Sequence, residues 1–157
     1  MNQHIERWFA EHKDAIRQFK DDVWEQPEVA FTEYFACRRT EKFLRDNGFE
    51  KVESFALESE SGEANCVRAE FGHGAPKLLI MGELDSVACP EHPEADPETG
   101  AVHSCGHCCQ AAGLLGVAAA LKEPGALDGL AGKIRLMAVP AEELIEDLLV
   151  LSDLTVL

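Results

Sequence analysis

The chain has 157 residues and a formal net charge of -15, from 29 acidic and 14 basic side chains. This length suffices for one domain with its own hydrophobic core, so stability needs no disulfide framework. The negative charge argues against nucleic acid or anionic lipid as a partner, and no cluster of Lys and Arg offsets it. The sequence shows neither a signal peptide nor an apolar run long enough to span a membrane. We therefore expect one globular cytoplasmic unit.

Helical periodicity marks the first part of the chain. Apolar residues recur at helical spacing between residues 5 and 23, which predicts a long amphipathic helix with one buried face. A second helix is predicted to begin near Thr32 and to end at Asn47 and Gly48, residues typical of a helix C-terminus. The aromatic side chains of both helices are interpreted as core residues.

After the second helix the pattern changes to strands. A weak strand at 52–57 and an alternating strand at 66–71 flank a polar turn and predict a hairpin. The segment 77–81 is apolar at every position but its first, which predicts a central strand covered on both faces. A similar strand at 134–139 follows a helix of small residues predicted at 105–121. Strand, helix and strand in this order predict two parallel strands.

Polar side chains follow these two strands. The acidic residues that follow them are Glu83, Asp85, Glu142 and Glu143. Because ligands of open α/β sheets bind beyond the carboxyl ends of the strands, we expect these residues to meet at one edge, together with Cys105 and His107 at the start of the intervening helix. The loop of residues 86–102 is expected to lie over this edge and to bring His92 as a further candidate group.

Cys105 and His107 are the strongest candidates for metal ligands. Thiolate and imidazole are typical zinc ligands, and a helix N-terminus favours a thiolate. Glu142 and Glu143 are adjacent carboxylates that repel each other unless a cation lies nearby, and such a pair can supply one ligand and one general base. Asp85 is interpreted as the carboxylate that orients the imidazole, and we count it with Glu142 among the candidate catalytic residues.

Other interpretations of the same residues stay open from sequence alone. The cysteines of segment 103–109 could be small residues at a helix start, Cys105 and Cys108 could form a redox pair, and both could join His103 and His107 in a structural zinc site. The acidic residues could instead cap a helix or a loop. The remaining cysteines are expected to be plain buried or loop thiols: Cys37, Cys66 and Cys89.

Several motifs of the chain together point to a known family. They are Gly82–Val87, Glu91–Asp96, Thr99–His107, Leu115–Ala118 and Val139–Glu143, with the pattern Trp24, Pro27, Glu28, Phe31 and Glu33 before them. These motifs resemble those of the metal-dependent amidohydrolase and peptidase family of aminoacylases and carboxypeptidase G. Within that family they resemble the branch of aminobenzoyl-glutamate, indoleacetyl-amino-acid and hippurate hydrolases.

The resemblance implies an α/β fold, a three-layer α/β/α catalytic domain like that of zinc peptidases with a mixed, mostly parallel central sheet. It implies two divalent metal ions, zinc or manganese, with Cys105, His107 and Glu143 as ligands and Glu142 as the general base. The implied reaction is hydrolysis of the amide bond between an acyl or aminobenzoyl group and an amino acid. The implied partner is a small N-acyl amino acid or a substrate like aminobenzoyl-glutamate, and a homo-oligomer is an open expectation.

The chain departs from the family in two respects. Cys108 and Cys109 follow His107, where the family usually has Asp or another polar residue, and family members are much longer. We therefore expect residues 1–157 to be the N-terminal part of a catalytic domain, truncated after its second central strand, lacking the dimerisation domain and the C-terminal part, and binding one ion or none. Segment 144–157 receives no place in the fold. The alternative functions are a non-catalytic metal-binding or interaction module and a thiol redox protein.

Overall fold

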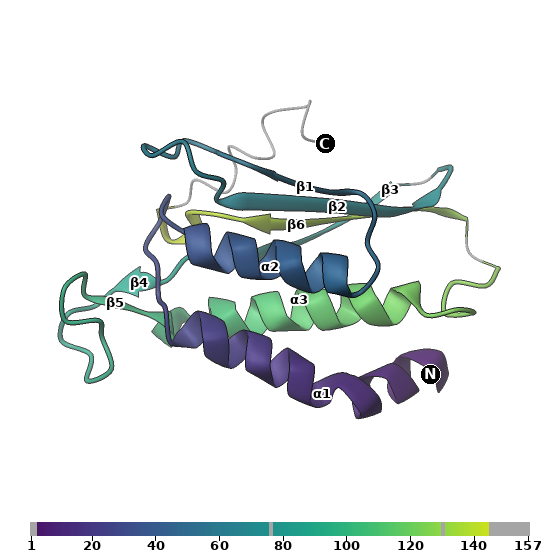
Figure 1. Cartoon of the computed structure of the whole chain (residues 1–157), viewed down its shortest axis with the longest axis horizontal. Coiled ribbons are helices and arrows are strands. Elements are labelled where there is room, and N and C mark those ends of the chain that lie inside the picture. The colour runs from purple at the N-terminus through teal and green to yellow at the C-terminus, as the bar shows by residue number, and fades with distance from the viewer. Residues whose placement is uncertain (1–2, 76, 130, 145–157) are drawn as a thin grey trace.

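The structure is a computed structural model that describes residues 3–75, 77–129 and 131–144, which form an α/β arrangement (Figure 1). The α-helices are α1 (Gln3–Trp24), α2 (Tyr34–Asp46) and α3 (His107–Lys122). The strands are β1 (Val52–Phe55), β2 (Cys66–His73), β3 (Lys77–Glu83), β4 (Val87–Ala88), β5 (Ala101–Val102) and β6 (Gly132–Val139). Two short 3-10 helices are η1 (His103–Cys105) and η2 (Glu142–Leu144).

Both predicted N-terminal helices are confirmed. Helix α1 buries Phe19 and Val23 on one face, as its apolar spacing predicted, and packs along α3. The two helices approach closely because α3 has Gly116 at their contact. A Cβ atom there would lie 2.8 Å from Ile16 and 2.9 Å from Phe9, shorter than real side chains allow. The small residues of α3 therefore serve packing as well as helix formation.

The main sheet has the strand order β1-β2-β6-β3. Strands β1 and β2 form the predicted antiparallel hairpin, with Val52 opposite Ala69, and β3 runs parallel to β6, with Gly82 opposite Ala138. Strand β6 also pairs antiparallel with β2. The α/β class and the mixed sheet are confirmed. Within the described residues, however, two of the three pairings are antiparallel, whereas a mostly parallel sheet was expected.

The prediction that segment 77–81 forms a central strand is wrong for the residues that the structure describes. Strand β3 ends the strand order and pairs with β6, and its Leu78 is 55% exposed. Strands β2 and β6 are the central ones. A uniformly apolar run favours a strand that is covered on both faces, but it does not ensure that cover, as Leu78 shows, and it does not say how many neighbours the strand has.

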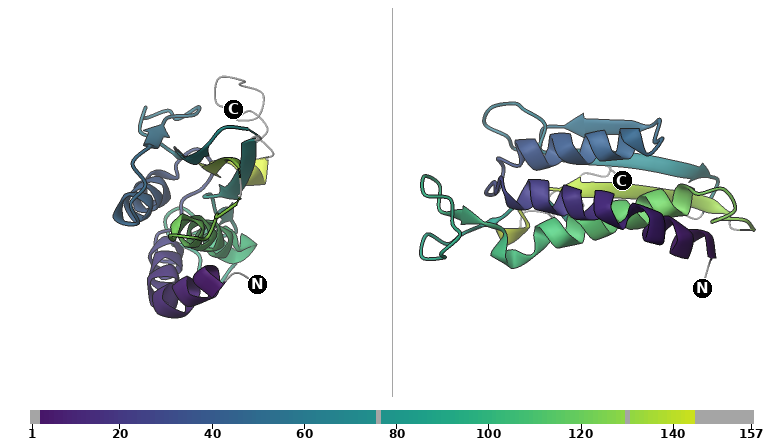
Figure 2. Two further views of the ribbon diagram at one scale, coloured as in Figure 1. Left: turned by 90° about the vertical axis from the view of Figure 1, so that its right-hand side faces the viewer. Right: turned by 60° about the horizontal axis from the view of Figure 1, so that its bottom comes forward.

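All three α-helices cover one face of the sheet (Figure 2). Alternate residues of β2 and β6, such as Val67 and Leu136, enter the main core with these helices. Met137 and Val139 lie on the opposite face in a smaller apolar cluster. The second helical layer of the expected three-layer domain is not seen in ranges 3–75, 77–129 and 131–144. Residues 145–157, nearly all of the segment without an assigned place, lie outside the described residues.

No helix in the described part of the chain is both long enough and apolar enough to cross a membrane.

Glu70 on β2 forms ion pairs with two basic side chains of the neighbouring strand. Its carboxylate lies 2.7 Å from Lys133 Nζ and 2.8 Å from Arg135 Nη2, both on the neighbouring strand β6. Hydrogen bonds from these two side chains lower the pKa of Glu70 from 4.5 to about 2. The Glu70 side chain is 17% exposed, so solvent screens this pair less than it screens fully exposed pairs.

We predict that Glu70→Gln lowers the free energy of unfolding at pH 7 by about 1 kcal/mol. Because the folded-state pKa is depressed, this contribution is complete above pH 4.5 and is lost as the pH falls from 4.5 to about 2. Urea unfolding at pH 7 and pH 2.5 checks both statements. Glu63→Gln is the control, because Glu63 and its partner Arg38 are 59% and 62% exposed. An equal loss for both variants, or one independent of pH, contradicts the prediction.

Candidate metal centre

The carboxyl ends of β3 and β6 lie side by side because the two strands are parallel. The Leu84 N–H donates to the Val139 carbonyl at 2.9 Å, which extends this pairing past the end of β3. The pairing brings together the segments that carry the four acidic residues: Glu83, Asp85, Glu142 and Glu143. The edge at which these residues were expected to meet therefore exists in the structure.

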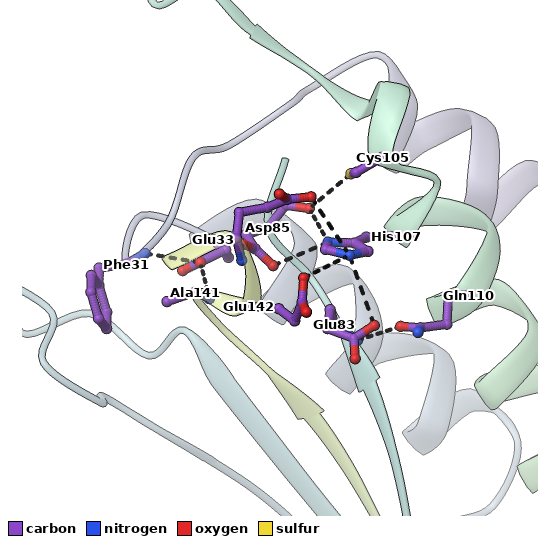
Figure 3. Close-up of polar contacts among 10 residues, drawn as sticks. Phe31, Glu33, Glu83, Asp85, Cys105, His107, Gln110, Ala141 and Glu142 are labelled. Carbon is purple, nitrogen blue, oxygen red and sulfur yellow. Dashed lines mark hydrogen bonds and ion pairs between the residues drawn. The ribbon is translucent and has the colours of Figure 1, made fainter. Parts of the chain in front are cut away.

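Cys105 and His107 reach the same edge from a sharp turn between η1 and α3. Helix α3 begins at His107 and not at Cys105 as predicted, since Cys105 ends η1. Gly106 joins the two helices with φ +93°, a left-handed conformation that is favourable only for glycine. This turn directs the thiol and the imidazole toward Asp85 (Figure 3).

Asp85 contacts all three residues that were predicted as metal ligands. Its carboxylate lies 3.2 Å from His107 Nδ1, and its backbone carbonyl lies 3.0 Å from the same nitrogen. The carbonyl also accepts a long contact of 3.8 Å from Cys105 Sγ. On its other side, Asp85 Oδ2 accepts the Glu143 N–H at 3.0 Å. Asp85 is fully buried, so water does not compete for these contacts.

The imidazole of His107 has one nitrogen for Asp85 and one for the acidic cluster. Both partners of Nδ1 are acceptors, so Nδ1 carries a proton. Nε2 faces carboxylate oxygens of Glu142 at 3.4 Å, Glu143 at 3.9 Å and Glu83 at 4.0 Å. Nε2 is therefore the nitrogen that is placed to bind a metal ion, while Asp85 fixes the orientation of the ring.

Electrostatics at this edge favour a cation. Hydrogen bonds with Asp85 and Cys105 raise the pKa of His107 to about 11. Burial opposes ionisation of Asp85, but the His107 ring and the Glu143 N–H outweigh it and lower the Asp85 pKa. A protonated His107 ring supplies a positive charge beside these carboxylates. A divalent ion at Nε2 can take over that charge.

The donor atoms fit a divalent metal ion. Ligand atoms of Cys105, His107 and Glu143 all lie within 4.8 Å of one another, and they supply a thiolate, an imidazole and a carboxylate. Three protein ligands of these kinds are typical of a zinc site that keeps a position open. No other such group was found in the residues that the structure describes, so the alternative site that adds His103 and Cys108 is not formed.

The burial of Cys108 argues against a redox pair with Cys105. Cys108 is completely buried against the core, and burial raises the pKa of its thiol to about 12. A catalytic thiol requires the opposite shift. Cys37 and Cys66 are also buried and burial raises the pKa of each, while Cys89 lies in a loop, as expected. The redox interpretation has no support from this geometry.

Two further residues at the site were not predicted from the sequence, although helical spacing could have placed one of them there. Gln110 lies three residues after His107 on the same helical face, and its side-chain oxygen accepts the Glu83 N–H at 2.8 Å. Glu33 belongs to the pattern that carries the family resemblance, but nothing in the sequence indicated that it is buried next to the strand end, where it contacts Ala141. His92, in contrast, is engaged within its own loop, where its Nδ1 accepts the Glu94 N–H at 3.1 Å.

A pocket of about 370 Å³ adjoins the candidate centre through Glu143. Its wall consists mostly of aliphatic side chains, and its polar members are Glu143 and the buried Ser86. The Ser86 hydroxyl has no hydrogen-bond partner among the described residues. The complete wall is formed by Val29, Ala30, Ser86, Val87, Ala88, Glu143 and Leu144.

Comparisons with known sequences agree with the resemblance. Residues 79–147 match peptidase family M20/M25/M40. One of the p-aminobenzoyl-glutamate hydrolase chains of Escherichia coli (strain K12) is 28% identical over 153 residues, which cover 90% of this chain and 30% of that protein. Thermostable carboxypeptidase 2 of Saccharolobus solfataricus is 30% identical over 138 residues, covering 85% and 33%. The N-acetyl-L-cysteine deacetylase of Bacillus subtilis is 32% identical over 120 residues, covering 74% and 27%.

Solved structures share the fold. A dinuclear metal-binding peptidase of the M20 family from Bacillus subtilis superposes with a TM-score of 0.64 at 23% identity, covering 87% of this chain and 39% of that one. An aminobenzoyl-glutamate utilization protein from Klebsiella pneumoniae gives 0.62 at 17% identity, covering 87% and 38%. The predicted resemblance to this family is confirmed. The chain spans roughly a third of the length of the curated relatives it matches.

We predict that the thiols react with iodoacetamide at pH 8 in the order of their burial. Cys109 is exposed and is labelled first, whereas Cys37, Cys66 and Cys108 react at least about tenfold more slowly until the protein is unfolded. Peptide mass spectrometry after timed labelling gives the rate at each site, and the same reaction in urea is the control. Labelling of Cys108 as fast as that of Cys109 would restore the redox interpretation.

Proposed function

Because the chain is related in sequence and in fold to peptidase family M20, we propose that it takes part in metal-dependent hydrolysis of an amide bond. The proposed bond joins an acyl or aminobenzoyl group to an amino acid. The observation that carries the proposal is the placement of Cys105, His107 and Glu143 around one point, with Glu142 beside them at the open edge.

The proposed ligands favour zinc over manganese. A cysteine thiolate is a soft ligand that prefers zinc, whereas manganese sites are built mainly from oxygen ligands. When bound, a divalent ion polarises the substrate carbonyl and lowers the pKa of water. The resemblance to the family implies two metal ions. The described residues supply a ligand group for one of them. Cys105, His107 and Glu143 are the residues proposed to hold that ion.

Glu142 is proposed as the general base. Its carboxylate lies 3.4 Å from His107 Nε2, so it borders the proposed ion position, and its side chain is 41% exposed and open to substrate. In the proposed reaction Glu142 takes a proton from the attacking water and delivers it to the nitrogen of the leaving amino acid. Asp85 does not touch the substrate in this scheme. It positions the ring of His107 and the backbone of Glu143.

The pocket beside Glu143 favours a small apolar group of the substrate. Its wall is mainly aliphatic, and the residues described there include no Lys or Arg that could pair with a carboxylate. We therefore propose an N-acyl amino acid with an uncharged acyl group and an uncharged side chain as substrate, rather than aminobenzoyl-glutamate, which carries a second carboxylate. The names of two relatives, p-aminobenzoyl-glutamate hydrolase and N-acetyl-L-cysteine deacetylase, correspond to these two substrate types. A cytoplasmic location belongs to the same proposal.

We predict that protein purified without chelator contains zinc, and that Cys105→Ser and His107→Ala each lose it. Glu142→Gln keeps the metal but lowers kcat for N-acetyl amino acids by a factor on the order of 10² to 10⁴, because only the proton transfer is removed. Elemental mass spectrometry measures the metal, and an amine-release assay measures the reaction. His73→Ala, at an exposed position on β2, is the matched histidine control.

The outcomes separate the two classes of function. Zinc that disappears with Cys105→Ser, together with hydrolysis that disappears with Glu142→Gln, supports the enzyme. Zinc without any hydrolysis supports the non-catalytic metal-binding module. Protein without zinc, or zinc retained in both ligand variants, contradicts the proposed centre.

A further inference from the structure

Glu33 links two parts of the chain that lie 108 residues apart in sequence. It directly precedes α2 and is 0% exposed. Its Oε1 accepts the Phe31 N–H at 2.9 Å and the Ala141 N–H at 2.9 Å (Figure 3). Ala141 is the residue immediately before the proposed general base Glu142. A single buried oxygen therefore joins the N-terminal segment to the loop that carries the site.

The backbone that Glu33 holds is strained at both contacts. Phe31 has φ +67° and Ala141 has φ +62°, and both residues carry a Cβ atom that makes this left-handed conformation unfavourable. Such conformations persist where the surrounding structure fixes them. At Ala141 the fixed conformation sets the direction in which the chain leaves β6, and thus where Glu142 and Glu143 point.

The loop of Glu142 and Glu143 is held by a carboxylate on each side. Glu33 accepts the Ala141 N–H before the pair, and Asp85 accepts the Glu143 N–H within it. Both carboxylates are buried, so neither contact is exchanged for one with water. The Asp85 contact fixes the ligand Glu143, while the Glu33 contact fixes the entry to Glu142.

A simple capping role does not account for Glu33. It occupies the N-cap position of α2 but makes no side-chain capping hydrogen bond. Glu28 performs that task instead, accepting the Phe35 N–H at 2.8 Å and the Ala36 N–H at 3.0 Å. Burying a carboxylate is costly, and burial raises the pKa of Glu33 to about 7. The two contacts that offset this cost go to Phe31 and to Ala141 in the site loop, and neither goes to the helix.

We propose that Glu33 is a positioning residue of the hydrolytic site, which holds the Ala141 backbone so that Glu142 and Glu143 face His107. This inference rests on the proposed function. Glu33 acts through the backbone and does not touch the metal or the substrate. Its loss therefore weakens metal binding and turnover together.

The test compares Glu33→Ala and Glu33→Gln with Glu28→Ala by zinc competition against a chromogenic chelator. We expect Glu33→Ala to weaken zinc binding by about 10-fold or more, as for other residues that orient metal ligands. Glu33→Gln keeps an acceptor oxygen in the same place and stays within about threefold of the parent. Glu28→Ala loses an α2 cap and melts earlier without metal, yet keeps the zinc affinity of the parent.

Two further results decide the inference. If Glu33→Ala does not fold, as judged by circular dichroism, Glu33→Asp replaces it, because its shorter acid cannot reach Ala141 and is expected to weaken zinc binding equally. Unchanged zinc affinity in a folded Glu33→Ala or Glu33→Asp, with zinc bound by the parent, overturns the inference and leaves the proposed function intact. A parent that binds no zinc overturns both.

Discussion

The site depends above all on Asp85, one buried residue whose contacts reach every candidate ligand. Its carboxylate and carbonyl hold the His107 ring, its carbonyl also meets Cys105, and its second oxygen holds the Glu143 backbone. These contacts come from three separate segments of the chain. Their convergence requires that β3 and β6 end together, which their parallel pairing ensures. The sheet thus places Asp85 within contact distance of the candidate ligands.

Charge explains why such an arrangement needs a cation. Four acidic residues gather at the edge, and the His107 imidazole lies between them. A carboxylate cluster of this kind is unfavourable unless a positive charge compensates it. A thiolate, an imidazole and a carboxylate around one point are suited to zinc, and Glu142 at the open side is suited to proton transfer. The chemistry proposed for the chain follows from these two requirements together.

Much of this arrangement was readable from local sequence. Helical spacing predicted α1 and α2, the change to alternating and apolar runs predicted the strands, and strand-helix-strand order predicted that Asp85 and Glu142 meet at one edge. Each of these features is determined by residues that lie close together in the sequence, so a local pattern can predict it. The edge position of β3 was not predictable, because an apolar run does not reveal how many strands flank it. The Glu33 contact was missed for a related reason, since it spans 108 residues and Glu33 resembles an ordinary helix cap.

The most direct test of the central claim, that Cys105, His107 and Glu143 share one metal ion, is X-ray absorption at the zinc edge of the zinc-loaded protein. The account predicts one sulfur neighbour at about 2.3 Å, with nitrogen and oxygen neighbours at about 2.0 to 2.2 Å. Cys105→Ser should remove the sulfur shell. A spectrum without sulfur, or one with two or more sulfur neighbours that point to Cys108 or Cys109, would contradict the account.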